Sequence, residues 1–136
     1  EAMRLIRVTQ ESFFEGMKYA REGCRLSDIS AAVQAYVESN GFSIVREYVG
    51  HGIGRRVHEP PEVPNYGNPG HGPRLLRGMT LAVEPMVNAG SAAIKQMADG
   101  WTVKTADGKN AAHYENTILI TAGEPELLTD PEKSLV

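Results

Sequence analysis

The chain has 136 residues and a mass of 14.8 kDa, a length that suits one domain. Its 17 acidic and 14 basic residues give a formal net charge of -3, so the electrostatic footprint of a nucleic-acid-binding protein is absent. The hydrophobic fraction of 41% is typical of a globular protein, and no apolar run approaches the roughly 20 residues that cross a bilayer. Cys24, the single cysteine, excludes an internal disulfide and favours a cytoplasmic location.

The first quarter of the chain is predicted to be helical. A helix is expected from Ala2 to about Arg21, with an apolar stripe made by Met3, Ile6, Phe13 and Met17 and widened by Leu5 and Phe14. The chain begins with Glu1-Ala2-Met3, already inside this pattern and without an initiator methionine. We therefore expect that residue 1 is not where the natural protein begins.

A second helix is predicted before residue 41. Its apolar residues, spaced by three and four, are Ile29, Ala32, Val33, Tyr36 and Val37. Ser27 or Asp28 is expected to cap its first turn, and Asn40-Gly41 to end it.

The rest of the chain favours strands. Phe42 to Val49 is a strand candidate, and Gly50 to Gly78 is expected to be a long irregular stretch rich in glycine and proline. Further strands are predicted at about Met79 to Val87, Trp101 to Thr105 and Ala112 to Thr121, with Asp99-Gly100 and Asp107-Gly108 as hairpin turns. Two helices followed by a run of strands predict an α+β fold with a curved, mainly antiparallel sheet.

Two histidines flank a glycine-rich segment, Gly50 to Pro60. The glycines beside His51 allow close approach of the backbone to a ligand, and His58 follows seven residues later. A lone histidine is more often structural or solvent-exposed than a ligand. Two of them in so permissive a segment make a ligand role as plausible as a structural one.

Two glutamates interrupt otherwise apolar strand patterns. Alternation places Glu84 with Thr80 and Ala82, on the face opposite Leu81 and Val83. A buried carboxylate needs a partner or a metal ion, although a solvent-facing glutamate would need neither.

Glu115 presents the same choice, on a strand face shared with His113, Thr117 and Leu119. The alternative is again a half-exposed sheet with its polar residues outward. One imidazole and two carboxylates suit ions such as Mn, Fe(II), Co or Zn. Two divalent ions carry four positive charges, whereas Glu84 and Glu115 supply two negative charges, so a two-metal site requires further carboxylates from elsewhere.

Three segments in this order and spacing resemble the C-terminal half of the type I methionine aminopeptidases: GHGIGRRVHEPPEVPNYG, RGMTLAVEPMVNAG and DGWTVKTADGKNAAHYENTILIT. The helical segment VTQESFFEGM is also similar, so the resemblance covers essentially the whole chain. The prolidase and Xaa-Pro aminopeptidase group shares the fold and similar ligand types, but DGWTVKT and HYENTILIT are closer to the methionine enzymes.

The resemblance implies a pita-bread fold, two related halves around a curved antiparallel sheet that holds two divalent metals. It also implies hydrolytic removal of the initiator methionine from nascent polypeptides by metal-activated water. His51 and Glu84 match ligands of one metal, and Glu115 matches the carboxylate that bridges both. Glu84 or a neighbouring carboxylate would accept the proton of the attacking water.

The resemblance also assigns substrate contacts. His58 matches the histidine that contacts the substrate carbonyl and the tetrahedral intermediate. Trp101 matches a residue that lines the methionine side-chain pocket. Val57 stands where members often place a bulkier residue at the same pocket.

In that family, two aspartate ligands and another catalytic histidine lie upstream of the first helix. We therefore expect residues 1–136 to be the C-terminal portion of a single catalytic domain, inactive alone and associated with the missing N-terminal half or with itself. The alternatives are a non-catalytic binding module on the same fold and a prolidase-like peptidase.

Overall fold

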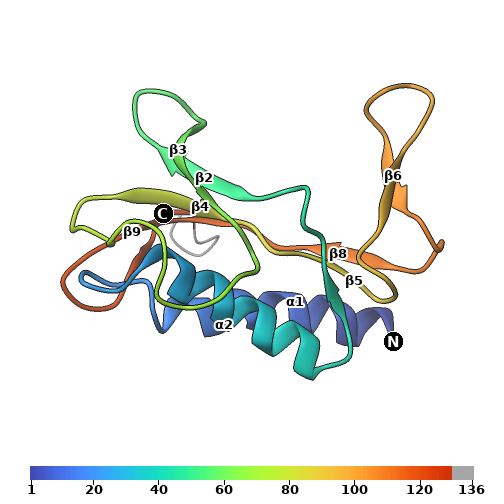
Figure 1. The fold of residues 1–136 in the computed structure, drawn as a ribbon, viewed down its shortest axis with the longest axis horizontal. Helices are drawn as coiled ribbons and strands as arrows, with labels where there is room; N and C mark the ends of the chain where they lie inside the picture. The colour runs from blue at the N-terminus through green and yellow to red at the C-terminus, as the bar shows by residue number, and fades with distance from the viewer. Residues whose placement is uncertain (130–136) are drawn as a thin grey trace.

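The computed structural model describes residues 1–129 of the chain (Figure 1). Its helices are α1 (Ala2–Met17) and α2 (Leu26–Ser39). The strands are β1 (Ser43–Ile44), β2 (Gly50–Ile53), β3 (Glu59–Val63), β4 (Thr80–Val83), β5 (Met86–Asn88), β6 (Ile94–Gln96), β7 (Val103–Thr105), β8 (Ala111–His113), β9 (Asn116–Leu119) and β10 (Glu126–Leu127).

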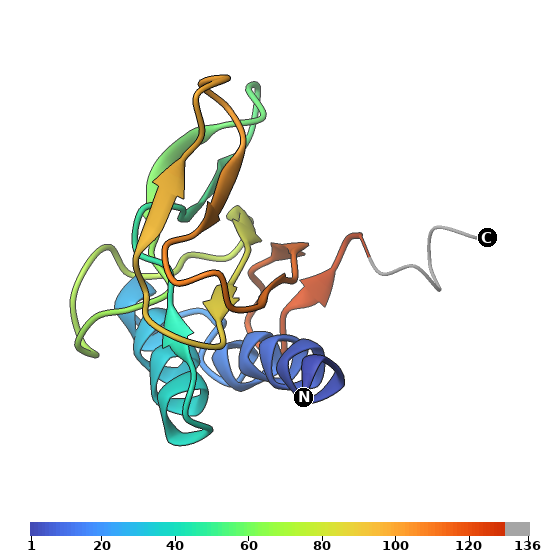
Figure 2. The same ribbon diagram turned by 90° about the vertical axis from the view of Figure 1, so that its right-hand side faces the viewer.

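The strands form three antiparallel units. The largest sheet has the order β10-β9-β4-β2-β3, a second sheet has the order β1-β5-β8, and β6 pairs with β7. Both helices lie against one side of the sheets, while the β2–β3 and β6–β7 hairpins rise on the other side (Figures 1 and 2). The predicted α+β class with an antiparallel sheet is confirmed.

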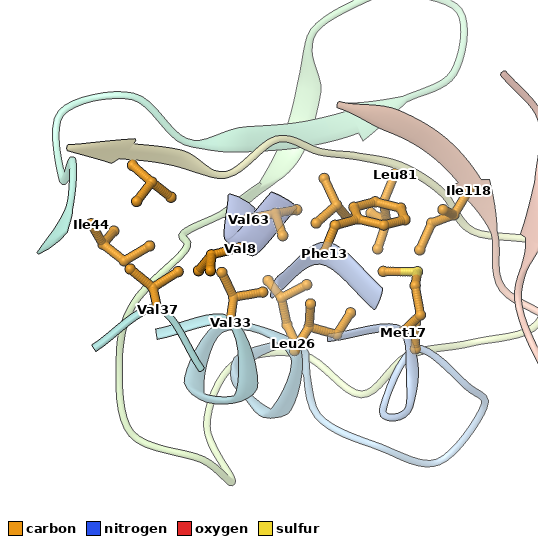
Figure 3. Close-up of a cluster of buried hydrophobic side chains, with 14 of the residues drawn as sticks. Val8, Phe13, Met17, Leu26, Val33, Val37, Ile44, Val63, Leu81 and Ile118 are labelled. Carbon is orange, nitrogen blue, oxygen red and sulfur yellow. The ribbon is translucent and has the colours of Figure 1, made fainter. Parts of the chain in front are cut away.

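The hydrophobic core fills the space between the helices and the sheets (Figure 3). Phe13 of α1 is fully buried, and its ring meets that of Tyr114 edge-on with centroids 5.3 Å apart. The two helices pack closely at Gly16, where an added Cβ would lie 3.0 Å from Val33 Cγ2. The core covers the face of the sheets that meets the helices, so polar side chains can lie on the opposite face.

The first helix buries only part of the predicted stripe. Leu5, Val8, Phe13 and Met17 face the core, but Met3 is 78% exposed and Ile6 55% exposed. Phe14 is also exposed, and the helix ends at Met17 rather than near Arg21. The helix is apolar on more than one side, so the periodicity identified Leu5, Phe13 and Met17 of the buried face but also included exposed residues.

The second helix follows its predicted apolar pattern and ends at Asn40-Gly41, where Gly41 has φ of +83°. Its N-cap is Arg25, so neither Ser27 nor Asp28 takes that position. The Asp28 carboxylate instead accepts a hydrogen bond from the Arg25 N–H at 2.8 Å. The Ser27 hydroxyl accepts one from the His71 N–H at 2.7 Å.

The predicted strand at Phe42 to Val49 is wrong over most of its length, because only Ser43–Ile44 pairs, with β5. The stretch from Gly50 to Gly78 is not wholly irregular, since it holds the β2–β3 hairpin. The Asp99-Gly100 turn joins β6 to β7 as predicted. The Asp107-Gly108 turn is present, but the strands on its two sides belong to different sheets.

Two long predicted strands are each broken in the middle. The strand at Met79 to Val87 divides into β4 and β5 at Glu84-Pro85, because proline has no N–H for the ladder. The strand at Ala112 to Thr121 divides into β8 and β9 at Tyr114-Glu115. The strand at Trp101 to Thr105 is shorter than predicted and begins at Val103. Among residues 1–129, neither helix is long and apolar enough to cross a bilayer.

Candidate metal centre

His51 lies on β2, which runs between β3 and β4 in the five-stranded sheet. Glycines on both sides let the neighbouring backbones approach closely. A Cβ on Gly50 would overlap the carbonyl oxygen of Ala82, and one on Gly52 would overlap the carbonyl oxygen of Pro60. The imidazole is largely buried, with 14% of the side chain exposed, and its Nδ1 lies 3.1 Å from the Gly52 carbonyl oxygen. Because this Nδ1–carbonyl contact favours a proton on Nδ1, Nε2 is available as a ligand.

Glu84 follows the last residue of β4, at the break before β5. Its carboxylate oxygen Oε2 lies 3.5 Å from His51 Nε2, and 19% of its side chain is exposed. The solvent-facing alternative therefore does not describe Glu84, because its carboxylate turns toward an imidazole.

Glu115 is the third member of the group, and it lies at the break between β8 and β9. Its neighbour Tyr114 packs toward Phe13 in the core, so Glu115 is turned to the opposite side. One possible ligand atom from each of His51, Glu84 and Glu115 lies within 4.8 Å of the other two. Of the three, Glu115 is the most exposed.

The electrostatics of this group favour a cation. Burial raises the pKa of Glu84 above its ordinary value of 4.5, and the nearby charge of Glu115 raises it further. The His51 imidazole acts in the opposite direction. Two carboxylates held together in this way are unfavourable without a positive charge between them.

The donor set fits a divalent ion. Metal–nitrogen and metal–oxygen distances of about 2.0–2.2 Å allow one ion to reach three ligand atoms spaced in this way after small side-chain rotations. An imidazole with two carboxylates suits Mn, Fe(II), Co or Zn. The two carboxylates balance one such ion but not two.

His58 lies beside His51 in this group. Its ring lies 4.0 Å from that of His51 between centroids, with 33° between the ring planes. A surface hollow of about 430 Å³ includes both histidines among its lining residues. Val57, in the same β2–β3 loop, is 69% exposed.

Trp101 lies apart from this group. It sits in the turn between β6 and β7 and is 82% exposed. The β6–β7 hairpin stands away from the β2–β3 hairpin in Figure 1. Among residues 1–129, the structure brings together His51, His58, Glu84 and Glu115, but it does not bring Trp101 to them.

Two residues beside the group were not singled out from the sequence. Glu59 follows His58, and its carboxylate accepts a hydrogen bond from the Arg56 N–H at 2.8 Å, which closes the β2–β3 loop. Asn65 is fully buried and donates from Nδ2 to the Glu84 carbonyl oxygen at 3.2 Å. The position of Glu59 next to His58 was a usable signal. The sequence around Asn65 gave no such signal, because its partner, Glu84, lies 19 residues away.

Antiparallel sheets with helices on one side, and an imidazole and two carboxylates gathered on a strand and at two strand breaks, are the features of an α+β protein with a candidate metal-binding site. Comparison with known sequences gives the family. The chain belongs to metallopeptidase family M24, whose sequence profile matches residues 1–122.

The chain is similar to curated methionine aminopeptidases. It is 63% identical over 129 residues to the methionine aminopeptidase of Clostridium perfringens, a match covering 95% of this chain and 52% of that protein. It is 56% identical over 126 residues to methionine aminopeptidase 1 of Bacillus subtilis, covering 93% of this chain and 51% of that protein. The chain therefore spans about half the length of these relatives.

The fold is similar to solved structures of the same group. The crystal structure of methionine aminopeptidase from Thermotoga maritima matches with a TM-score of 0.91 and 50% identity, over 93% of this chain and 51% of that one. Prolidase from Pyrococcus furiosus matches with a TM-score of 0.70 and 19% identity, over 94% of this chain and 32% of that one, which shows a shared fold alone. The resemblance to pita-bread methionine aminopeptidases is confirmed.

Proposed function

We propose that this chain supplies one half of the active site of a methionine aminopeptidase, which removes the N-terminal methionine from new polypeptides in the cytoplasm. The observation that carries the proposal is the convergence of His51, Glu84 and Glu115, whose ligand atoms lie within 4.8 Å of one another. The high identity to methionine aminopeptidases supports the choice of substrate.

The residues have distinct roles in the proposed reaction. His51, Glu84 and Glu115 hold divalent ions (Co, Mn, Fe or Zn), which when bound polarise the scissile carbonyl and lower the pKa of a water. Glu84, or a neighbouring carboxylate, accepts the proton from the attacking water. His58, next to His51, donates a hydrogen bond to the oxyanion that develops on the substrate carbonyl. Val57 and Trp101 contact the methionine side chain.

A two-metal site needs more carboxylates than Glu84 and Glu115. The chain corresponds to about half of its relatives, so we propose that it is the C-terminal portion of one catalytic domain and that the remaining half supplies the other ligands. Alone, the chain is inactive and binds metal weakly. Trp101 reaches the methionine pocket only when the other half is present.

The proposed missing half, or a second copy of this chain, covers apolar surface on α1. Met3, Ile6 and Phe14 are exposed on this helix, although large apolar side chains are unfavourable in water. Among residues 1–129, β3 is an edge strand of the five-stranded sheet and is open to further pairing. Intact mass and light scattering test this, and a stable isolated 14.8 kDa monomer would contradict it.

The function is tested on the natural-length protein with a Met-Ala peptide and added Mn or Co. Release of methionine is expected, and no turnover with any divalent metal overturns the proposal. Preference for an Ala-Pro peptide would instead support a prolidase-like enzyme. Absence of bound metal after purification and reconstitution would support the non-catalytic binding module.

A further inference from the structure

The main chain leaves the sheet at Glu84. The β4–β9 ladder ends with the pair Val83 and Asn116, and Pro85 has no N–H to continue it. The Glu84 carbonyl therefore lies at a break between two sheets, where its orientation is not set by a strand ladder. The direction of the Glu84 side chain depends on how this peptide is held.

A buried asparagine holds this peptide from another element. Asn65 follows β3, is 0% exposed, and donates from Nδ2 to the Glu84 carbonyl oxygen at 3.2 Å. The other end of the amide, Oδ1, is buried without a hydrogen-bond partner among residues 1–129. An apolar side chain at this position would avoid the cost of the unpaired Oδ1, but it would leave the Glu84 carbonyl without this donor, so packing alone does not account for an asparagine. The bond to Glu84 does.

We propose that Asn65 is a positioning residue for the metal centre, and that it sets the direction of the Glu84 carboxylate by fixing the Glu84 peptide. This inference rests on the proposed metal-binding role of Glu84. Residues that orient metal ligands through hydrogen bonds change metal affinity when they are removed, without contacting the ion. Asn65 does so through the main chain rather than through the carboxylate.

The chain offers a closely matched control in Asn88. It is 1% exposed, its Nδ2 donates to the Ser91 carbonyl oxygen at 3.0 Å, and its Oδ1 also lacks a partner among residues 1–129. Its bond holds the segment that leads from β5 toward β6, not the Glu84 peptide. Asn65→Leu and Asn88→Leu thus remove the same chemical group from the same degree of burial.

The test measures Mn(II) affinity of the natural-length protein by calorimetry, after removal of metal with a chelator, together with the visible absorption of the Co(II)-loaded form. Asn65→Leu is expected to weaken Mn binding by about tenfold or more and to change the shape of the Co(II) absorption bands. Asn88→Leu is expected to retain the parent affinity and spectrum. Thermal melts of the metal-free proteins should show similar destabilisation in both variants.

Parent-like affinity and spectrum in Asn65→Leu would overturn the inference, as would equal losses of affinity in both variants. If Asn65→Leu does not fold, Asn65→Ser is the replacement, since its shorter side chain leaves room for water and cannot span to the Glu84 carbonyl. Asn65→Ser is also expected to weaken Mn binding, by less than Asn65→Leu. Unchanged Mn affinity in Asn65→Ser would equally overturn the inference. A parent protein that binds no Mn would overturn the proposed function as well, so the two failures are distinguishable.

Discussion

The imidazole rings of His51 and His58 lie over one another, with centroids 4.0 Å apart and planes inclined by 33°. One ring belongs to β2 and the other to the loop that connects β2 to β3. Only His51 is within reach of Glu84, with 3.5 Å between His51 Nε2 and Glu84 Oε2. The two histidines therefore share one place in the fold but differ in their contact with Glu84, which is consistent with the proposed division between metal binding by His51 and substrate contact by His58.

Replacing each histidine with alanine should separate these roles. In the natural-length protein, His51→Ala removes a proposed ligand, and Mn affinity is expected to fall by about tenfold or more. His58→Ala should leave Mn affinity unchanged and lower kcat on a Met-Ala peptide by about 10²- to 10³-fold, because it removes a donor to the developing oxyanion. Calorimetry and steady-state kinetics measure the two effects. Loss of Mn binding in His58→Ala would contradict the division of roles.

Glu84→Gln should have opposite effects on metal binding and on stability. The substitution removes a negative charge that lies partly buried near Glu115, so the metal-free protein is expected to melt at a higher temperature at pH 7.5. The same change removes a proposed ligand, so Mn should no longer raise the melting temperature as it does for the parent. Calorimetric melts with chelator and with Mn measure both effects.

The control for this substitution is Glu62→Gln, on the exposed side of β3. It neutralises a glutamate that lines the same hollow but lies outside the three-residue group. Its melting temperature should still rise on addition of Mn. A Glu84→Gln variant that is less stable than the parent without metal would show that the carboxylate has a favourable partner in the apo fold.

The pH dependence of stability can be tested at an ion pair away from this site. Glu22, in the connection between the helices, receives Nη2 of Arg77 on Oε1 at 3.0 Å and the Arg77 N–H on Oε2 at 3.3 Å. These contacts hold the pKa of Glu22 below its ordinary value of 4.5. Because the pKa is lower in the folded state, the pair stabilises the fold above pH 4.5, and this contribution is lost as the pH falls through the folded-state pKa.

Chemical denaturation of the parent and of Glu22→Gln at several pH values measures this contribution. The parent and Glu22→Gln should differ by a small amount in their free energy of unfolding. This difference should be constant from neutral pH to pH 5 and should shrink at more acidic pH. Added salt should reduce it at neutral pH, since the pair is exposed. Glu38→Gln is the control, because Glu38 contacts the amide of Gln34. A gap between parent and Glu22→Gln that widens toward acidic pH would contradict the prediction.

The periodic parts of the fold could be predicted from the sequence because burial determines them. The residues Ile29, Val33 and Val37 of α2 are all buried, as their spacing predicts. The first helix shows the limit of this reasoning. Met3 and Ile6 are as apolar as Leu5 and Val8, so periodicity could not select the face that meets the sheet.

The convergence of the site depends on strand register, which the sequence does not encode locally. Ala82 of β4 stands opposite His51 on one side and opposite Thr117 on the other. This register brings Glu84, two residues beyond Ala82, close to Glu115, two residues before Thr117. Alternation identified both glutamates as polar residues within apolar strands. Their meeting with His51 follows from the pairing of strands that are far apart in the chain.

The close approach of β2 to β3 makes Gly52 a sensitive position beside the candidate metal centre. A Cβ there would overlap the carbonyl oxygen of Pro60 and lie 2.9 Å from that of Glu59, both of them backbone atoms of β3 that cannot rotate away. Gly52→Ala should force β2 and β3 apart and displace the adjacent His51, with a cost in stability of about 1–3 kcal/mol and a fall in Mn affinity. Gly123→Ala is the matched control, because nothing lies within 4 Å of its added Cβ. Denaturant unfolding and Mn calorimetry on both variants measure the effects, and a Gly52→Ala protein with parent-like stability would mean that the two strands can separate without cost.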